Sequence, residues 1–165
     1  MLKDIDKSIE NIARTDIKII GFGNKFRCDD GIGPSVIEEL EKLDISKNKN
    51  IEIIDGSTSG WDLILHLKEC PRIIIVDALD AGQDAGEVIC INEKDIEKFI
   101  DKKITSLSLH DLDLGDILKL SRALKIETDI TIIGVKPVSI GFGENLSPEV
   151  KEKIPEIISR IIQMI

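Results

Sequence analysis

Short aliphatic runs that alternate with amphipathic segments constrain the fold of this chain more than any other feature. Strands buried on both faces of a parallel sheet consist almost entirely of aliphatic residues. Four such runs stand at residues 17–23, 51–55, 72–78 and 129–135. Between and after them, apolar residues recur at helical spacing, which predicts helices over residues 33–44, 60–69, 108–124 and from Ser147 onward. This alternation predicts a three-layer α/β/α sandwich on a mixed, mostly parallel sheet.

A further strand is expected at residues 86–91, GEVICI, with a different direction. It follows the third aliphatic run too closely for a parallel crossover, which needs about a dozen residues or more. It is therefore expected to run antiparallel. A short helix or turn should follow over residues 92–100, another helix is expected over residues 2–13, and Pro155 should bend the last helix.

The length and charge of the chain limit its partners. We expect the 165 residues to form one domain, since this length can bury a substantial core. The 22 Lys and Arg against 31 Asp and Glu give a net charge of −9, so nucleic acid and anionic lipid are not expected partners. No aliphatic run is long enough to cross a membrane. The N-terminus lacks the apolar core of a signal peptide, and three cysteines form no CxxC pair, so a cytoplasmic protein without disulfides is expected.

The loop GFGNKFRCDDGIG, residues 21–33, begins like a nucleotide-binding loop but does not continue as one. A dinucleotide fingerprint requires glycine at its sixth position, where this chain has Phe26, and no GxxxxGK[ST] motif is present. Asp29 and Asp30 place negative charge where a phosphate would bind. No nucleotide cofactor is expected. One aspartate can cap the following helix, which leaves the other available for function.

Three side chains of metal-ligand type are expected at one edge of the sheet. Asp30 lies in the loop that leaves the first strand, and Asp77 lies at the end of the third strand. Functional groups of parallel α/β sheets gather where the strands end. His110 lies near the start of a predicted helix, where it tends to stay neutral and able to bind metal. Two carboxylates and an imidazole suit zinc, nickel, cobalt or iron(II). Capping by either aspartate and an incidental His110 are the alternatives, and His66 is expected in a surface or packing role.

Five sequence blocks in order resemble the maturation endopeptidases of nickel–iron hydrogenases. These blocks are GFGNxFRxDDGIG, DGSTSG, IIIVDA, SLHDLDLGDIL and IIGVKP. The resemblance implies a five-stranded sheet of order 2-1-3-5-4 with strand 4 antiparallel, as in phosphorylase/hydrolase-like folds. It also implies that Asp30, Asp77 and His110 form a trio that contacts nickel.

The resemblance implies a reaction as well. Such an endopeptidase, expected to be a monomer, removes the C-terminal extension of a hydrogenase large-subunit precursor after the precursor has received its nickel. Nickel could act as a Lewis acid or only as a recognition signal, and Asp30 or Asp77 could act as a general base. A non-proteolytic nickel or precursor chaperone using the same trio is the alternative. A generic nucleotide-binding protein is disfavoured by the acidic loop.

Some features depart from the family pattern. Residues 1–15 are expected to add an N-terminal helix, and Cys28 stands where a small or aliphatic residue is usual. A thiolate binds nickel well, but a lone cysteine is more often a bystander. The resemblance implies an aspartyl-type endopeptidase, yet Asp55 in DGS is not interpreted as catalytic. That chemistry needs two aspartates sharing a proton, and no second D[ST]G is present.

Overall fold

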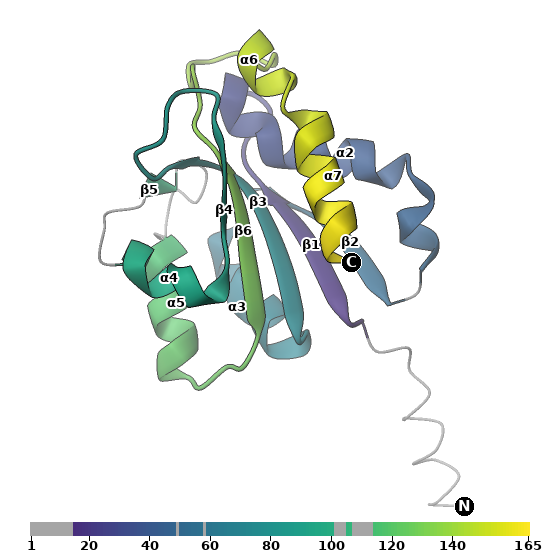
Figure 1. Cartoon of the computed structure of the whole chain (residues 1–165), viewed down its shortest axis with the longest axis vertical. Helices are drawn as coiled ribbons and strands as arrows, with labels where there is room; N and C mark the ends of the chain where they lie inside the picture. Colours follow the sequence, from purple (N-terminus) through teal and green to yellow (C-terminus); the bar gives the residue numbers. More distant parts are fainter. Residues whose placement is uncertain (1–14, 49, 58, 101–104, 107–113) are drawn as a thin grey trace, which may run out of the picture.

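The computed structural model describes residues 15–48, 50–57, 59–100, 105–106 and 114–165. It is a three-layer α/β/α sandwich (Figure 1). Its main sheet has the order β2-β1-β3-β6-β4, in which only β4 is antiparallel to its neighbour. The strands are β1 (Ile17–Phe22), β2 (Ile51–Ser57), β3 (Arg72–Asp80), β4 (Val88–Ile91) and β6 (Asp129–Val135). Since β6 is the fifth main strand along the chain, the predicted order and the antiparallel direction are confirmed.

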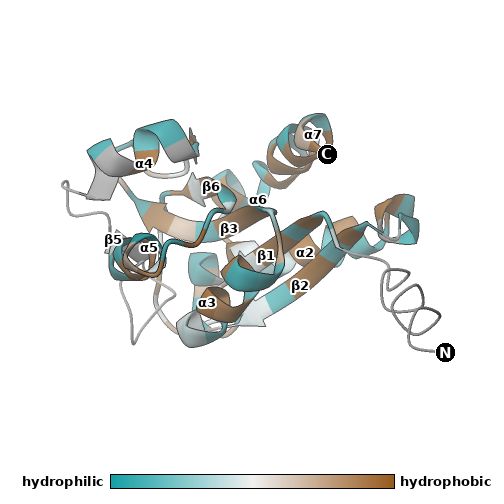
Figure 2. Ribbon diagram, turned by 90° about the horizontal axis from the view of Figure 1, so that it is seen from below, coloured by the Kyte–Doolittle hydropathy of each residue, from teal (hydrophilic) through white to brown (hydrophobic). Residues whose placement is uncertain are grey.

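Helices cover both faces of this sheet (Figure 1). The helices of one face are α2 (Ile32–Glu41) and α7 (Ile154–Met164). Those of the other are α3 (Gly60–Glu69), α4 (Glu93–Ile100) and α5 (Leu114–Ala123). Two apolar clusters lie between these layers and the sheet, and Figure 2 shows the hydrophobic strands between the helices.

The central strand β3 contributes to both clusters because its side chains alternate between faces. Ile73, Ile75 and Leu79 belong to the cluster on the α3–α5 side. Ile74, Val76 and Ala78 belong to the cluster on the α2–α7 side. Burying one such aliphatic side chain completely stabilises the folded state by about 1.5–3 kcal/mol relative to leaving it exposed. The alternation places Asp77 on the α3–α5 face of the sheet.

The last helix is broken rather than bent. A short helix, α6 (Pro148–Lys151), is separated from α7, which carries Pro155 in its first turn. Proline has no amide hydrogen to continue a helix, but it fits a first turn. Ser147 lies at the predicted N-cap position, although its hydroxyl makes no capping bond there.

Three short elements were not predicted. These are η1 (Cys28–Gly31), η2 (Asp44–Lys47) and β5 (Thr105–Ser106), which pairs antiparallel with the end of β3. The helix predicted over residues 33–44 is α2, which ends at Glu41, and Asp44 begins η2 instead. The predicted helix over residues 2–13 lies outside the described residues, as does the predicted helical segment 108–113.

Candidate functional site

Two of the three predicted site residues lie at the carboxyl edge of the parallel strands. Asp77 is near the end of β3, in register with Gly134 of β6, and it is fully buried. Asp30 lies in η1, which follows β1 and packs against β3, and it is 1% exposed. The structure therefore brings both carboxylates to the same edge of the sheet.

Glycines allow the loop after β1 to pack backbone against backbone. Gly23 has a φ of +140°, and a Cβ there would lie 1.8 Å from the Asp30 carbonyl oxygen. A Cβ at Gly33 would lie 2.7 Å from the carbonyl oxygen of Val76, the residue before Asp77. These glycines thus serve close packing of β1, η1, α2 and β3. The same packing holds Asp30 beside the strand that carries Asp77.

The carboxylate of Asp30 is held by its own loop. Its Oδ2 accepts a hydrogen bond of 3.1 Å from the backbone N–H of Asn24. The Asn24 side chain in turn accepts a bond from the backbone N–H of Phe26 at 2.9 Å. A carboxylate with a fixed orientation near the sheet edge suits a catalytic or ligand role.

Asp29 has a different role from the capping role expected of one member of the pair. The N-cap of α2 is Gly31, and no side chain caps either η1 or α2. Asp29 instead accepts backbone bonds from Val138 and Ser139 at 2.9 and 2.8 Å, and from Ser147 at 2.6 Å. The Ser147 hydroxyl donates a fourth bond, at 2.7 Å. The capping interpretation is therefore wrong: Asp29 joins the first loop to the connection between β6 and α6.

Sequence reasoning missed this role of Asp29. The four donors lie more than 100 residues away in sequence. The sequence offers one signal for this role. Two adjacent aspartates stand in a glycine-rich loop, which indicates that each has its own role.

Cys28 lies next to Asp29 and contacts the same connection. Its φ is +47°, and a Cβ on Gly143 would lie 2.9 Å from its sulfur. Its backbone N–H donates to the Gly143 carbonyl at 2.7 Å. The thiol thus packs beneath this connection.

Among the described residues, no group of three or more His, Cys, Asp and Glu side chains could hold a metal ion.

His110 lies outside the described residues. The described chain on either side of it consists of β5 and α5. β5 pairs with Leu79 and Asp80, just beyond Asp77, and α5 packs against α3 on the face to which Asp77 belongs.

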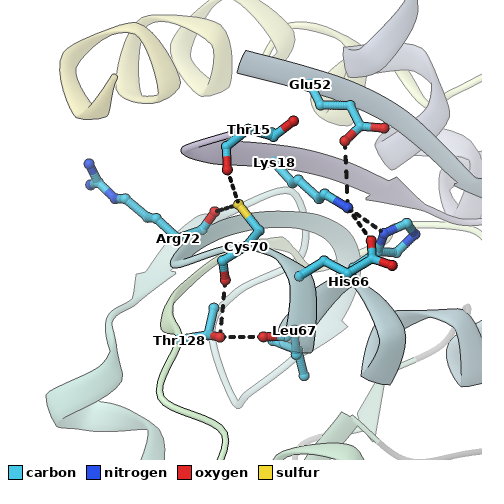
Figure 3. A network of polar contacts seen from close by, with 9 residues as sticks. Thr15, Lys18, Glu52, His66, Leu67, Cys70, Arg72 and Thr128 are labelled. Atoms are coloured by element: carbon cyan, nitrogen blue, oxygen red, sulfur yellow. Dashed lines mark hydrogen bonds and ion pairs between the residues drawn. The ribbon is translucent and has the colours of Figure 1, made fainter. Parts of the chain in front are cut away.

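His66 is not at this edge. It lies beside Lys18 (Figure 3), near the amino ends of the parallel strands, where Lys18 is in register with Glu52 and Ile73. The Lys18 ammonium donates to Nδ1 of His66 at 3.2 Å and to Glu69 at 2.9 Å. An ammonium can only donate, so Nδ1 carries no proton and the imidazole is neutral. His66 therefore has the packing role expected of it.

Burial and charge set the protonation of this network. Burial and the neighbouring positive charge of Lys18 lower the pKa of His66. Burial disfavours the charged form of Lys18, but its hydrogen bond to Glu69 and the charges of Glu52 and Glu69 outweigh it and raise the pKa of Lys18. The hydrogen bond from Lys18 lowers the pKa of Glu69.

The DGS motif forms the end of β2 rather than a catalytic pair. Oδ1 of Asp55 accepts a bond of 2.9 Å from the backbone N–H of Ser57. Its other oxygen lies 3.9 Å from the Lys25 ammonium. Gly56 belongs to β2 and Gly60 begins α3, whereas Thr58 lies outside the described residues.

Among the described residues, no helix has the length and apolar character needed to cross a membrane.

Comparison with known proteins gives the family. The family model HycI, described as hydrogenase maturation protease, matches residues 34–164. HupD, a hydrogenase expression/formation protein of Thiocapsa roseopersicina, is 27% identical over 150 residues, which are 90% of this chain and 66% of HupD. The hydrogenase 2 maturation protease of Escherichia coli is 28% identical over 148 residues, or 88% of each chain. The solved structure of the E. coli hydrogenase maturating endopeptidase HybD has a TM-score of 0.74 and 25% identity, and the match covers 90% of this chain and 91% of that one.

The chain belongs to the hydrogenase maturation protease family, a class of peptidases. The resemblance seen in the five sequence blocks and the expected peptidase class are thereby confirmed. The family match begins at Pro34, so it does not include the loop that carries Asp29 and Asp30.

Proposed function

We propose that this protein is the endopeptidase that removes the C-terminal extension of a nickel-loaded NiFe-hydrogenase large-subunit precursor. The observation that carries the proposal is the pair of buried carboxylates, Asp30 and Asp77, at one edge of the sheet in a chain of this family. Asp30 and Asp77 come from separate elements, η1 and β3, which pack against each other at this edge, as residues of one shared site must.

We propose His110 as the third member of the site. The chain before it, β5, pairs with Leu79 and Asp80 at the end of β3, and the chain after it, α5, packs on the face of the sheet to which Asp77 belongs. A segment that connects these two elements can carry an imidazole to the carboxyl edge of β3. Asp30, Asp77 and His110 would then supply two oxygens and one nitrogen, a donor set that suits nickel.

In the proposed reaction, nickel belongs to the substrate. The trio contacts the nickel carried by the precursor, and this contact would restrict cleavage to loaded precursor. A water adds to the scissile carbonyl, and Asp30 or Asp77 takes a proton from that water as general base. The carbon–nitrogen bond breaks, and the proton passes to the nitrogen of the released extension. The products are a shortened subunit with a new carboxyl terminus and a free peptide.

We place this reaction in the cytoplasm. Cys28, Cys70 and Cys90 are free thiols, as expected in a reducing compartment.

One assay tests the proposed function. The protein is incubated with nickel-loaded and nickel-free large-subunit precursor from the same organism, and the intact mass of the precursor is measured. We expect a single shortened product from the loaded form only. Tight binding without any change of mass would replace the peptidase by a maturation chaperone, and cleavage of both forms would refute the nickel requirement.

A further inference from the structure

Four large apolar side chains are exposed on the two loops that Asp29 joins. Phe142 is 97% exposed and Phe26 is 66% exposed, and Val138 and Ile140 are 48% and 37% exposed. We call these four residues the apolar rim. The chain has only four phenylalanines, and two of them lie here in contact with solvent. Scattered apolar residues are normal on a surface, but a group that includes two aromatic rings marks an interaction site.

Backbone hydrogen bonds join the two loops of the apolar rim. Arg27 and Gly143 form a bridge, in which the Gly143 N–H donates to the Phe26 carbonyl at 3.0 Å. The guanidinium of Arg27 donates to the Ile140 carbonyl at 3.3 Å. Phe26 and Phe142 therefore flank the same bridge, one on each loop. Figure 1 shows the connection between β6 and α6 at the end of the molecule where α2 begins.

The apolar rim is also held rigidly. Asp29 fixes the connection at Val138 and Ser139 on one side and at Ser147 on the other. The Asp29 N–H donates back to the Ser139 carbonyl at 3.0 Å. A loop that is ordered before binding loses little conformational entropy on binding, which favours affinity.

We propose that the apolar rim docks an apolar surface of the large-subunit precursor beside the cleavage site. This inference rests on the proposed function, and it assigns a binding surface to that same site. Phe26 and Asp30 belong to one loop, whose backbone is fixed through Asn24. A partner that covers the rim is thereby brought to the carboxyl edge of the sheet. A peptidase that cuts one bond of a folded protein needs such contacts away from that bond.

The test compares rim variants with a matched control. The rim variants are Phe26→Ser with Phe142→Ser, and Val138→Ser alone. The control is Leu124→Ser, because Leu124 has the same exposed fraction as Val138, 48%, but follows α5 near the amino end of β6. Thermal unfolding establishes that each variant is folded. KM and kcat for cleavage, and Kd for nickel-loaded precursor immobilised on a sensor, are then measured.

We expect the double variant to raise KM and Kd about tenfold or more while kcat at saturating precursor stays within about twofold. Val138→Ser should raise KM more than Leu124→Ser does. Unchanged KM and Kd in the double variant would overturn the docking surface, and so would an equal effect of the control. If the wild type binds but does not cut, the proposed function fails and Kd alone decides the docking surface. If it neither binds nor cuts, both proposals fail.

Discussion

Asp29 and Asp30 are adjacent in sequence and equally buried, yet their carboxylates have different surroundings. Both oxygens of Asp29 accept hydrogen bonds from the β6–α6 connection. Asp30 is oriented by the Asn24 N–H within its own loop and lies beside β3. Burial alone thus does not separate an acid that joins two loops from one that we propose to be catalytic.

The site residues lead to a first prediction at this scale. Asp30→Asn, Asp77→Asn and His110→Ala should each lower cleavage of loaded precursor by about 100-fold or more, since each removes a group that we propose as a nickel ligand or general base. Product formation is measured by intact mass, and folding by circular dichroism. His66→Ala is the control and should cleave at close to the wild-type rate. Full activity in all three site variants would contradict the assignment.

A second prediction concerns Asp29. Asp29→Asn replaces a charged acceptor by a group whose NH₂ faces backbone N–H donors, so the free energy of unfolding should fall by about 2–4 kcal/mol. Urea denaturation measures this change. Asp44→Asn provides the control, because Asp44 is exposed and its ion pair with Lys47 should contribute little. An unfolding midpoint equal to that of the control would show that Asp29 does not anchor the connection.

The sequence could predict that Asp30 and Asp77 lie at the carboxyl edge of the sheet, because each follows an aliphatic strand run; their roles as site residues stay predictions. It could not predict the task of Asp29, since its partners come from the other end of the chain. The apolar rim could not be predicted either, because Phe142 has no periodic pattern around it and only the fold shows that it is exposed.

At the scale of elements, the loop between β1 and α2 depends on close backbone approach. Gly23 touches the carbonyl of Asp30, and Gly33 touches that of Val76. A glycine-rich loop after a first strand often indicates a phosphate site, but here the missing Cβ atoms bring two carboxylates to the sheet edge.

A third prediction compares two glycines that both have positive φ. Gly23→Ala places a Cβ against backbone, whereas Gly82→Ala, at a φ of +94°, meets nothing within 4 Å. Gly82→Ala should cost only the conformational strain, about 1–2 kcal/mol, and Gly23→Ala should cost at least about 3 kcal/mol. Urea denaturation of both variants provides the comparison. Equal losses would mean that the packing at Gly23 relaxes easily.

Strand positions were predictable because Val and Ile runs determine where buried strands lie, and β6 has the predicted bounds. The antiparallel β4 followed from the short connection before it. The break between α6 and α7 was not predicted, because one helical stripe continues through both. β5 has only two residues and arises from pairing with the end of β3, which no local pattern encodes.

At the scale of the whole molecule, the two ends of the sheet carry different groups. The carboxyl edge carries Asp30, Asp77 and the apolar rim. The amino edge carries the network of Lys18, which joins β1, β2 and α3 (Figure 3). Family membership adds the class of reaction, which the fold alone does not provide.

The amino-edge network gives a fourth prediction. The pKa of His66 is lowered by burial and by Lys18, with Glu69, Glu52 and Asp62 opposing. Between that depressed pKa and the ordinary value of 6.5, the unfolded chain binds more protons than the folded one, so stability falls as pH decreases through this window.

His66→Gln keeps an acceptor for Lys18 and removes the titration. Unfolding free energies from about pH 7.5 to about pH 5 should therefore fall more steeply for the wild type than for the variant. The pKa of Glu69 is lowered mainly by its hydrogen bond to Lys18, which both proteins keep. Parallel pH profiles would contradict the neutral state of His66.

The most direct test of the central claim is a crystal structure of the protein soaked with a divalent ion such as nickel. The claim predicts one ion, located by its anomalous scattering, with ligand atoms of Asp30, Asp77 and His110 about 2.0–2.3 Å from it. An ion bound elsewhere, or a His110 ring directed away from the two carboxylates, would contradict it.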